Sequence, residues 1–126
     1  GLGDSLITSY QTYRALLPEI HGALGKTKAP AAISLILEDT NEDGHMILWD
    51  DYREPSDPET AFYYAVYAFP EGTRPDISDV RYLMSISTNP YFILPSMERG
   101  ITYRYMVTAI NRFWQESKPA SIRISY

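Results

Sequence analysis

The stretch ITYRYMVTAIN, residues 101–111, decides the fold that we expect for this chain. Its odd-numbered positions carry apolar or aromatic side chains, whereas the even-numbered positions include Thr102, Arg104 and Thr108. β-Branched and aromatic residues that alternate with a period of two are typical of a strand with one buried and one wetter face. We therefore predict a long central strand here. The residues expected to face the core are Ile101, Tyr103, Tyr105, Val107 and Ala109.

The composition limits the class of protein. A length of 126 residues suits one domain of about 100 residues with an additional segment. The net charge of −5 and the scattered basic residues argue against a nucleic-acid partner. There is no cysteine, which excludes a disulfide framework, and no apolar run approaches the roughly 20 residues that span a bilayer. We expect no membrane insertion.

Six further segments have strand character and are separated by turn residues. They are residues 32–38, 45–50, 62–69, 85–88, 91–94 and 117–126. Between the third and fourth of these, residues 76–84 have helical spacing, with Asp76 as a possible cap, and predict a short helical insert. Short strands at even spacing, without an internal repeat, predict an all-β fold: a seven-stranded antiparallel immunoglobulin-like sandwich.

The first 28 residues differ from the rest. Residues 5–13 predict a short helix with Tyr10 on its apolar stripe, residues 16–20 an extended apolar strap, and residues 22–30 have linker composition. We interpret residues 1–28 as the tail of a preceding domain and its linker, or as a strap across the domain that follows. Residues 29–126 then form the second domain.

Several short motifs together resemble a known family. They are Pro30, Ile47-Leu48-Trp49, Tyr64-Ala65-Val66-Tyr67, Leu94 with Gly100, Thr102-Tyr103 with Val107 and Ala109, and Glu116-Ser117-Lys118-Pro119. In their order and spacing they resemble the fibronectin type III domain over about residues 29–126. The resemblance implies that Trp49 packs between the sheets and that Tyr103 forms a corner hydrogen bond to the preceding loop. The other expected core residues are Tyr64, Val66, Leu94 and Val107.

About residues 1–24 resemble the closing stretch of the barrel in bacterial, Bacteroides-like glycoside-hydrolase-like proteins of the family-10 type. Those barrels are often followed by a type III module whose third strand is similar to residues 63–69 and whose insert is similar to residues 75–79. The resemblance implies a non-catalytic accessory or spacer module at the C-terminus of a secreted glycoside hydrolase. Its partner would be the upstream catalytic domain of the same chain, in an extracellular, periplasmic or cell-surface location.

One stretch matches a calcium-loop pattern. Asp39, Asn41 and Asp43 alternate before Gly44, and Asp50 follows six residues later. An EF-hand loop joins two helices, however, whereas the flanking segments here alternate with a period of two. The same residues are explained by a tight turn, so calcium is the weaker alternative.

Catalytic chemistry is not indicated by the remaining polar residues. Acid pairs at 42–43 and 50–51, and Asp57 with Glu59, could in principle supply two glycosidase carboxylates, but they lie in loops rich in proline and glycine. His21 and His45 fall in unrelated segments, which does not favour a zinc site or a catalytic triad. We expect no catalytic residue and no cofactor.

Aromatic residues are the candidates for binding. If the third expected strand buries Tyr64 and Val66 in the core, then Tyr63 and Tyr67 point to its other face, which would be unusually apolar for solvent. Phe113 and Trp114 lie in the last loop. We favour a face covered by the insert or by the upstream barrel. The alternatives are a carbohydrate-binding module that stacks polysaccharide on these four residues and a protein-adhesion module.

Overall fold

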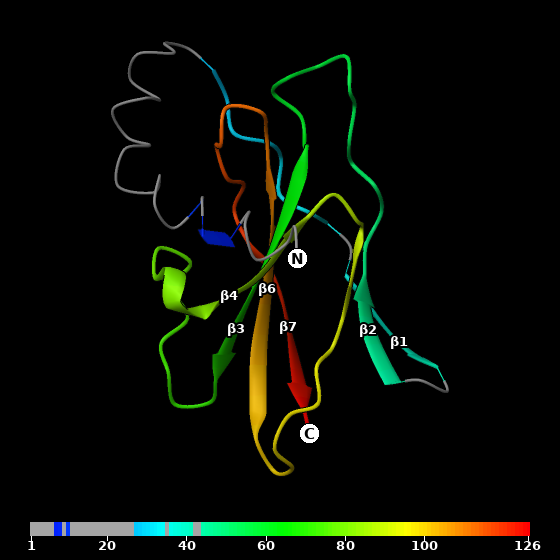
Figure 1. The fold of residues 1–126 in the computed structure, drawn as a ribbon, viewed down its shortest axis with the longest axis vertical. Helices are drawn as coiled ribbons and strands as arrows, with labels where there is room; N and C mark the ends of the chain where they lie inside the picture. Colours follow the sequence, from blue (N-terminus) through cyan, green and yellow to red (C-terminus); the bar gives the residue numbers. More distant parts are fainter. Residues whose placement is uncertain (1–6, 9, 11–26, 35, 42–43) are drawn as a thin grey trace.

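The computed structural model describes residues 7–8, 10, 27–34, 36–41 and 44–126. Residues 7, 8 and 10 are helical, and the part of the chain described from residue 27 onward forms strands and one short 3₁₀ helix (Figure 1). The strands are β1 (Leu37–Asn41), β2 (Gly44–Leu48), β3 (Tyr63–Pro70), β4 (Leu83–Ser87), β5 (Tyr91–Ile93), β6 (Thr102–Ile110) and β7 (Ala120–Ser125), and the helix is η2 (Val80–Tyr82).

The strands make two antiparallel sheets. The first has the order β1-β2-β5 and the second the order β4-β3-β6-β7. The long strand β6 lies between β3 and β7, and its register with β3 runs from Tyr63 opposite Ile110 to Pro70 opposite Tyr103. Figure 1 shows the first sheet beside β7 and β6, and one buried cluster draws residues from both sheets. The prediction of an all-β antiparallel sandwich is confirmed.

The core between the sheets is built around one tryptophan. Trp49 is 4% exposed, and its ring meets Tyr64 of β3 edge to face at a centroid distance of 5.4 Å. Val66, Leu94 and Val107 are buried in the same cluster. Tyr103 is half-buried and packs against the cluster from the end of β6. Because successive side chains of a strand point to opposite faces, Tyr64 and Val66 of β3 lie on the same face of the sheet as Tyr103 and Val107 of β6.

The second face of the four-stranded sheet is also covered by apolar side chains. The residues of β3 from Tyr64 to Phe69 are all buried, so this strand is enclosed on both faces. We call the group on the second face the outer cluster. Its buried members are Tyr10, Ala65, Tyr67, Phe69, Leu83, Ile86 and Ile110, and its half-buried members are Ile7, Tyr63, Ile77, Tyr82, Met106 and Trp114.

The first strand and its turn differ from the prediction. Strand β1 begins at Leu37 rather than at residue 32, and its pairing with β2 extends to Asn41 opposite Gly44. Asp39 and Asn41 therefore lie in a strand, whose extended backbone is incompatible with a calcium loop. Asp43, the third proposed ligand, lies outside the described residues.

The predicted helical insert over residues 76–84 is present only as one short turn. Only Val80–Tyr82 are helical, in a single 3₁₀ turn, and Leu83 already begins strand β4. The reason is local: Asp76 accepts a hydrogen bond from the Ser78 amide at 2.9 Å, and Asp79 accepts one from the Arg81 amide at 3.2 Å. Such side-chain bonds compete with the α-helical hydrogen-bonding pattern.

The hydrogen bond expected from the Tyr103 hydroxyl to the preceding loop is absent among the described residues, which include that whole loop. The Tyr103 ring instead meets Tyr126 edge to face at 5.9 Å. It is the neighbouring core-facing residue, Tyr105, that bonds through its hydroxyl to the hydroxyl of Tyr126, at 2.6 Å. Tyr126 thus holds the start of β6, through this hydroxyl contact and through backbone hydrogen bonds with Gly100 and Ile101.

Candidate docking face on the four-stranded sheet

Glu116 is the polar centre of the outer cluster. It follows β6 and forms an isolated antiparallel bridge with Ile110, which places its half-buried side chain against the sheet. One carboxylate oxygen, Oε1, accepts a hydrogen bond from the Tyr10 hydroxyl at 2.7 Å. The other, Oε2, accepts one from the Tyr67 hydroxyl at 2.6 Å and another from Thr108.

These contacts overturn one expectation from the sequence. Thr108 was predicted to lie on a wetter face, but it is 0% exposed. Its hydroxyl satisfies its hydrogen-bonding requirement by donating to Glu116, so burial costs it little. The face therefore excludes water at a position whose residue type suggested solvent.

Three aromatic rings stack beside this carboxylate. The indole of Trp114 stacks on Tyr10 at a centroid distance of 5.4 Å and on Tyr63 at 5.1 Å, with interplanar angles of 26° and 22°. The Phe62 ring meets Tyr63 edge to face at 4.6 Å. We call Tyr10, Trp114 and Tyr63 the aromatic stack. It joins a residue near the start of the chain to the β3 strand and to the loop between β6 and β7.

The backbone of that loop is held in an unusual conformation. Trp114 has φ of 60°, in the left-handed region that bulky residues rarely adopt. Asn111 imposes it: the Asn111 Oδ1 atom accepts hydrogen bonds from the amides of Phe113 and Gln115, both at 3.0 Å, and the Trp114 amide donates to the Asn111 carbonyl at 3.0 Å. The loop is thereby fixed so that the indole reaches the stack.

The same loop binds the segment that enters the sandwich. The Asn111 amide group donates to the Lys28 carbonyl at 2.9 Å, and the Gln115 amide group donates to the Thr27 carbonyl at 3.2 Å. Asn111 is 0% exposed, so these are interior hydrogen bonds. Residues 27–28 and Tyr10 are thus all attached to one loop.

The residues proposed to bind sugar lie within or beside these contacts. Tyr67, a candidate for either sugar or domain contact, is 0% exposed, so in this structure its ring offers no free surface to the sugar alternative. Trp114 and Tyr63 are half-buried and stacked on protein rings, and Phe113 is half-buried in the loop. The residues packed with Tyr67 in the outer cluster come from distant parts of the sequence, among them Tyr10 and Ile110.

Acidic side chains in the neighbouring loop, residues 51–60, which contacts Asn111 and Arg112, are engaged in turns. Asp51 accepts hydrogen bonds from the Arg53 guanidinium at 2.8 and 3.0 Å and from the Tyr64 hydroxyl at 3.0 Å. Asp57 accepts one from the Glu59 amide at 3.0 Å. In the part of the chain that the structure describes, no group of three or more histidine or acidic side chains could hold a metal ion. Nor does any described helix have the length and apolarity needed to cross a membrane.

Asp51 predicts a small pH dependence of stability. Hydrogen bonding to Arg53, partly opposed by burial, lowers the pKa of Asp51 to about 2 from its ordinary value of 3.8. A lowered pKa in the folded state adds stability above pH 4 that is lost as the pH falls toward 2. We expect Asp51→Asn to lower the urea midpoint slightly at pH 6.5 and not at pH 2, because the pair is partly exposed. An equal difference at both pH values would contradict this reading.

Sequence reasoning missed Glu116 and Asn111 as organising residues. Glu116 was noted only as part of a family motif, and Asn111 only as the end of a strand. The one available signal was a lone acid next to an aromatic-rich loop, FWQE at residues 113–116. It did not reveal the partners, because Tyr10 is 106 positions away and Tyr67 is 49 positions away.

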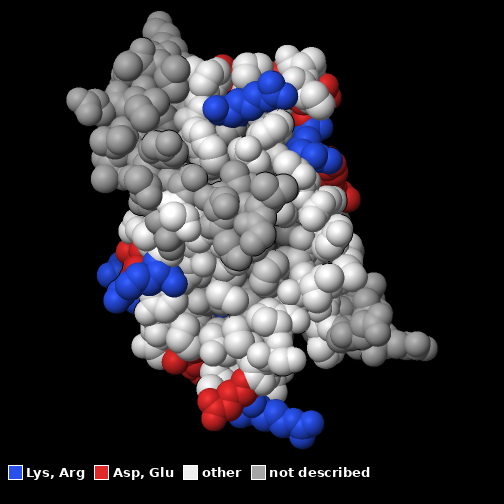
Figure 2. Space-filling view, viewed as in Figure 1, with Lys and Arg blue, Asp and Glu red and all other residues white. Residues whose placement is uncertain are grey.

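Among the residues that the structure describes, charged side chains form no extended field on the face drawn in Figure 2. Figure 2 shows blue and red groups scattered toward its outline, with white side chains between them. With a net charge of −5, this arrangement gives no support to binding of a nucleic-acid backbone.

Comparison with known proteins shows the fold. No family model matches the chain, and no curated protein matches it. Among solved structures, FN3tt mut matches with a TM-score of 0.54 and 13% identity over 78% of this chain and 97% of that one. The twitchin kinase region from C. elegans, which includes a fibronectin type III domain, matches with a TM-score of 0.51 and 15% identity over 79% of this chain.

The spore cortex lytic enzyme SleM of Clostridium perfringens matches with a TM-score of 0.50 and 8% identity over 77% of this chain. This chain spans 28% of the length of SleM and 17% of the twitchin region. At such identities the likeness shows fold alone. The chain has a fibronectin type III-like β-sandwich fold.

Proposed function

We propose that this chain is a non-catalytic accessory module that holds the polypeptide preceding its sandwich in a fixed orientation. One observation carries the proposal: Tyr10 is 1% exposed on the outer face of the sheet and donates a hydrogen bond to Glu116 at 2.7 Å. A side chain that is buried and hydrogen-bonded in this way cannot leave without exposing both its ring and a carboxylate.

The kinds of contact in the outer cluster are typical of an interface between domains. The outer cluster combines a buried apolar group, a stack of aromatic rings and one shared carboxylate. Burial of an aromatic side chain stabilises by about 2 to 3 kcal/mol, so a few such residues suffice to fix the angle between neighbouring segments. The sandwich would therefore position what lies upstream instead of tethering it loosely.

In its fuller form, the proposal places the module at the C-terminus of a secreted glycoside hydrolase, docked on the catalytic barrel. The similarity of about residues 1–24 to a barrel tail supports this context. SleM supports it in a second way, since a sandwich of this fold occupies only part of a longer lytic enzyme. The location that follows is extracellular, periplasmic or at the cell surface.

The proposal is tested by hydrogen exchange at the amides of residues 7, 8 and 10. In the wild type we expect protection at these amides, and in Tyr10→Ala we expect it to be lost while the amides of β3 and β6 stay protected. Tyr91→Ala is the matched control, because Tyr91 is 43% exposed and lies on the other sheet. Unprotected amides at residues 7–10 in the wild type would contradict docking.

The non-catalytic part of the proposal has its own measurement. We expect no turnover in a broad panel of glycosides. Turnover that a single Asp or Glu substitution abolishes would overturn it.

The two alternative functions have their own tests. For the carbohydrate-binding alternative, retardation on polysaccharide affinity gels that Trp114→Ala removes would favour sugar binding over docking. Capture of a protein that does not depend on residues 1–28 would favour adhesion.

A further inference from the structure

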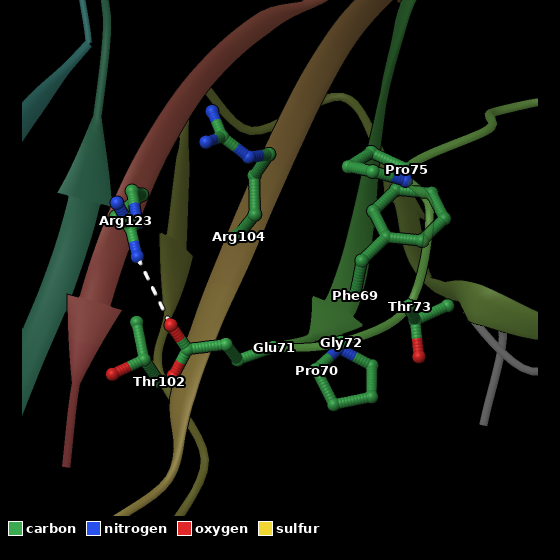
Figure 3. A pocket seen from close by; sticks show the side chains of 9 residues that line it. All are labelled: Phe69, Pro70, Glu71, Gly72, Thr73, Pro75, Thr102, Arg104 and Arg123. Carbon is green, nitrogen blue, oxygen red and sulfur yellow. Dashed lines mark hydrogen bonds and ion pairs between the residues drawn. The ribbon is translucent and has the colours of Figure 1, made fainter.

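The same sheet carries a cavity, at the end where β3 stops, that is lined by both apolar and charged side chains. It has a volume of about 240 Å³ and lies beyond the turn that follows β3. Figure 3 shows Arg104 and Arg123 on adjacent strands at this cavity, with Glu71 between Arg123 and the turn. Thr73 and Thr102 contribute hydroxyl groups to its wall.

The two arginines are direct cross-strand neighbours. Arg104 of β6 is opposite Arg123 of β7 in the register of the sheet, so both side chains are on one face. Residues directly opposite in an antiparallel pair have Cβ atoms about 4.5 to 5.5 Å apart, and like charges at this spacing are destabilising. The protein has more acidic than basic residues, with a net charge of −5, yet the two arginine charges are only partly neutralised.

A single acidic side chain faces this pair among the described residues. Glu71 accepts a hydrogen bond from the Arg123 guanidinium at 3.3 Å, and the side chains are 65% and 59% exposed. Arg104, which is half-buried, donates to the neutral Ser121 hydroxyl at 3.3 Å. Two guanidinium groups and one carboxylate leave one positive charge at the cavity.

We propose that this cavity binds a small oxyanion, a carboxylate or sulfate group, between Arg104 and Arg123. Guanidinium groups present forked donors that match the oxygens of such anions. The Glu71 carboxylate already occupies one of these donors and marks where an incoming oxyanion binds. Because the exposed Glu71–Arg123 pair is weak, an external anion can displace it. This site borders the outer cluster at Phe69, but the oxyanion proposal does not depend on the accessory role.

The test is an NMR titration of the full chain with sodium sulfate, with sodium chloride at equal ionic strength as the reference. We expect saturable shifts at the amides of Gly72, Thr73 and Thr102 with sulfate only. Arg104→Gln and Arg123→Gln should each weaken binding about tenfold, as expected for loss of a charge-assisted hydrogen bond. Arg81→Gln, which removes one charge outside the cavity, should leave the affinity within about twofold.

Glu71→Gln is expected to strengthen sulfate binding, whereas the arginine variants weaken it. It removes the carboxylate that competes with the ligand, so we expect sulfate to bind several-fold more tightly, whereas Glu98→Gln at an exposed position should have no such effect. Because Glu71 is exposed, this variant tests the site even if Arg104→Gln fails to fold. Equal affinity in the wild type and in Glu71→Gln, or the same shifts with chloride, would overturn the proposal.

The two sources of an oxyanion are separated by changing the probe. Inorganic sulfate and phosphate test a free anion, glucuronate tests the carboxylate of an acidic sugar, and glucose is the neutral control. Tighter binding of glucuronate than of sulfate, lost in Arg123→Gln, would identify an acidic sugar. Binding of sulfate alone would identify a free-anion site. No saturable shift with any of the anions would overturn the inference.

Discussion

Replacing Glu116 by alanine is expected to lower the free energy of unfolding by about 3 kcal/mol or more, because at least two buried hydroxyl groups lose their charged acceptor. Tyr67 and Thr108 are both 0% exposed, so water cannot replace the carboxylate without opening the sheet face. The Tyr10 hydroxyl loses the same acceptor, and residues 7–10 should detach. Urea unfolding gives the energy, and hydrogen exchange at the amides of residues 7–10 gives the detachment.

Two matched variants separate the hydrogen bonds from the charge. Glu116→Gln keeps one acceptor oxygen at nearly the same volume, so its loss of stability should lie between those of the wild type and Glu116→Ala. Glu98→Ala removes an exposed acid and should change the free energy of unfolding by less than about 0.5 kcal/mol. If Glu116→Ala were as stable as Glu98→Ala, the carboxylate would not be the centre of this face.

Trp49→Ala is expected to cost about 3 to 5 kcal/mol, the range for removing a large aromatic side chain from a packed core. Trp49 lies between the two sheets and contacts Tyr64 at 5.4 Å, so its loss leaves a cavity that neither sheet can close alone. Since single domains are stable by only about 5 to 15 kcal/mol, the variant should be at the limit of folding at 37 °C. Thermal unfolding followed by circular dichroism measures the loss.

Trp49→Phe is the comparison for this change. A phenyl ring fills most of the space, so we expect a loss of roughly 1 to 2 kcal/mol. Tyr91→Ala removes an exposed aromatic side chain from β5 and should lie within about 0.5 kcal/mol of the wild type. A loss for Trp49→Ala no greater than that of Tyr91→Ala would show that Trp49 is not central to the core.

The sandwich was predictable because its strands carry strong local patterns. Every second residue of β6 from Tyr103 to Ala109 belongs to the core between the sheets, and in β3 every residue from Tyr64 to Phe69 is buried. Such patterns depend only on the residues of one segment, so they can be read without neighbours. The helical insert was predicted too long for the same reason: the spacing of Ile77, Val80 and Leu83 suits a helix, but Asp76 and Asp79 form competing turns with their neighbours.

The candidate site was predictable only in part. An unusually apolar second face followed from the aromatic residues of β3, and it is present in the outer cluster. Its polar centre did not follow, because the contacts of Glu116 join segments that only tertiary folding brings together. The left-handed backbone at Trp114 was likewise invisible, since no glycine or asparagine marks that position.

Because β3 is enclosed on both faces, the position of an N-terminal truncation should decide whether the shortened protein stays monomeric. Truncation to residues 29–126 follows the domain boundary that the sequence suggests. It deletes Ile7 and Tyr10, however, and so exposes the apolar surface of Tyr67 and Ile110. Such a shortened protein should dimerise or aggregate during purification, because contiguous exposed apolar patches drive self-association. Expression that begins upstream of residue 7 should keep it monodisperse.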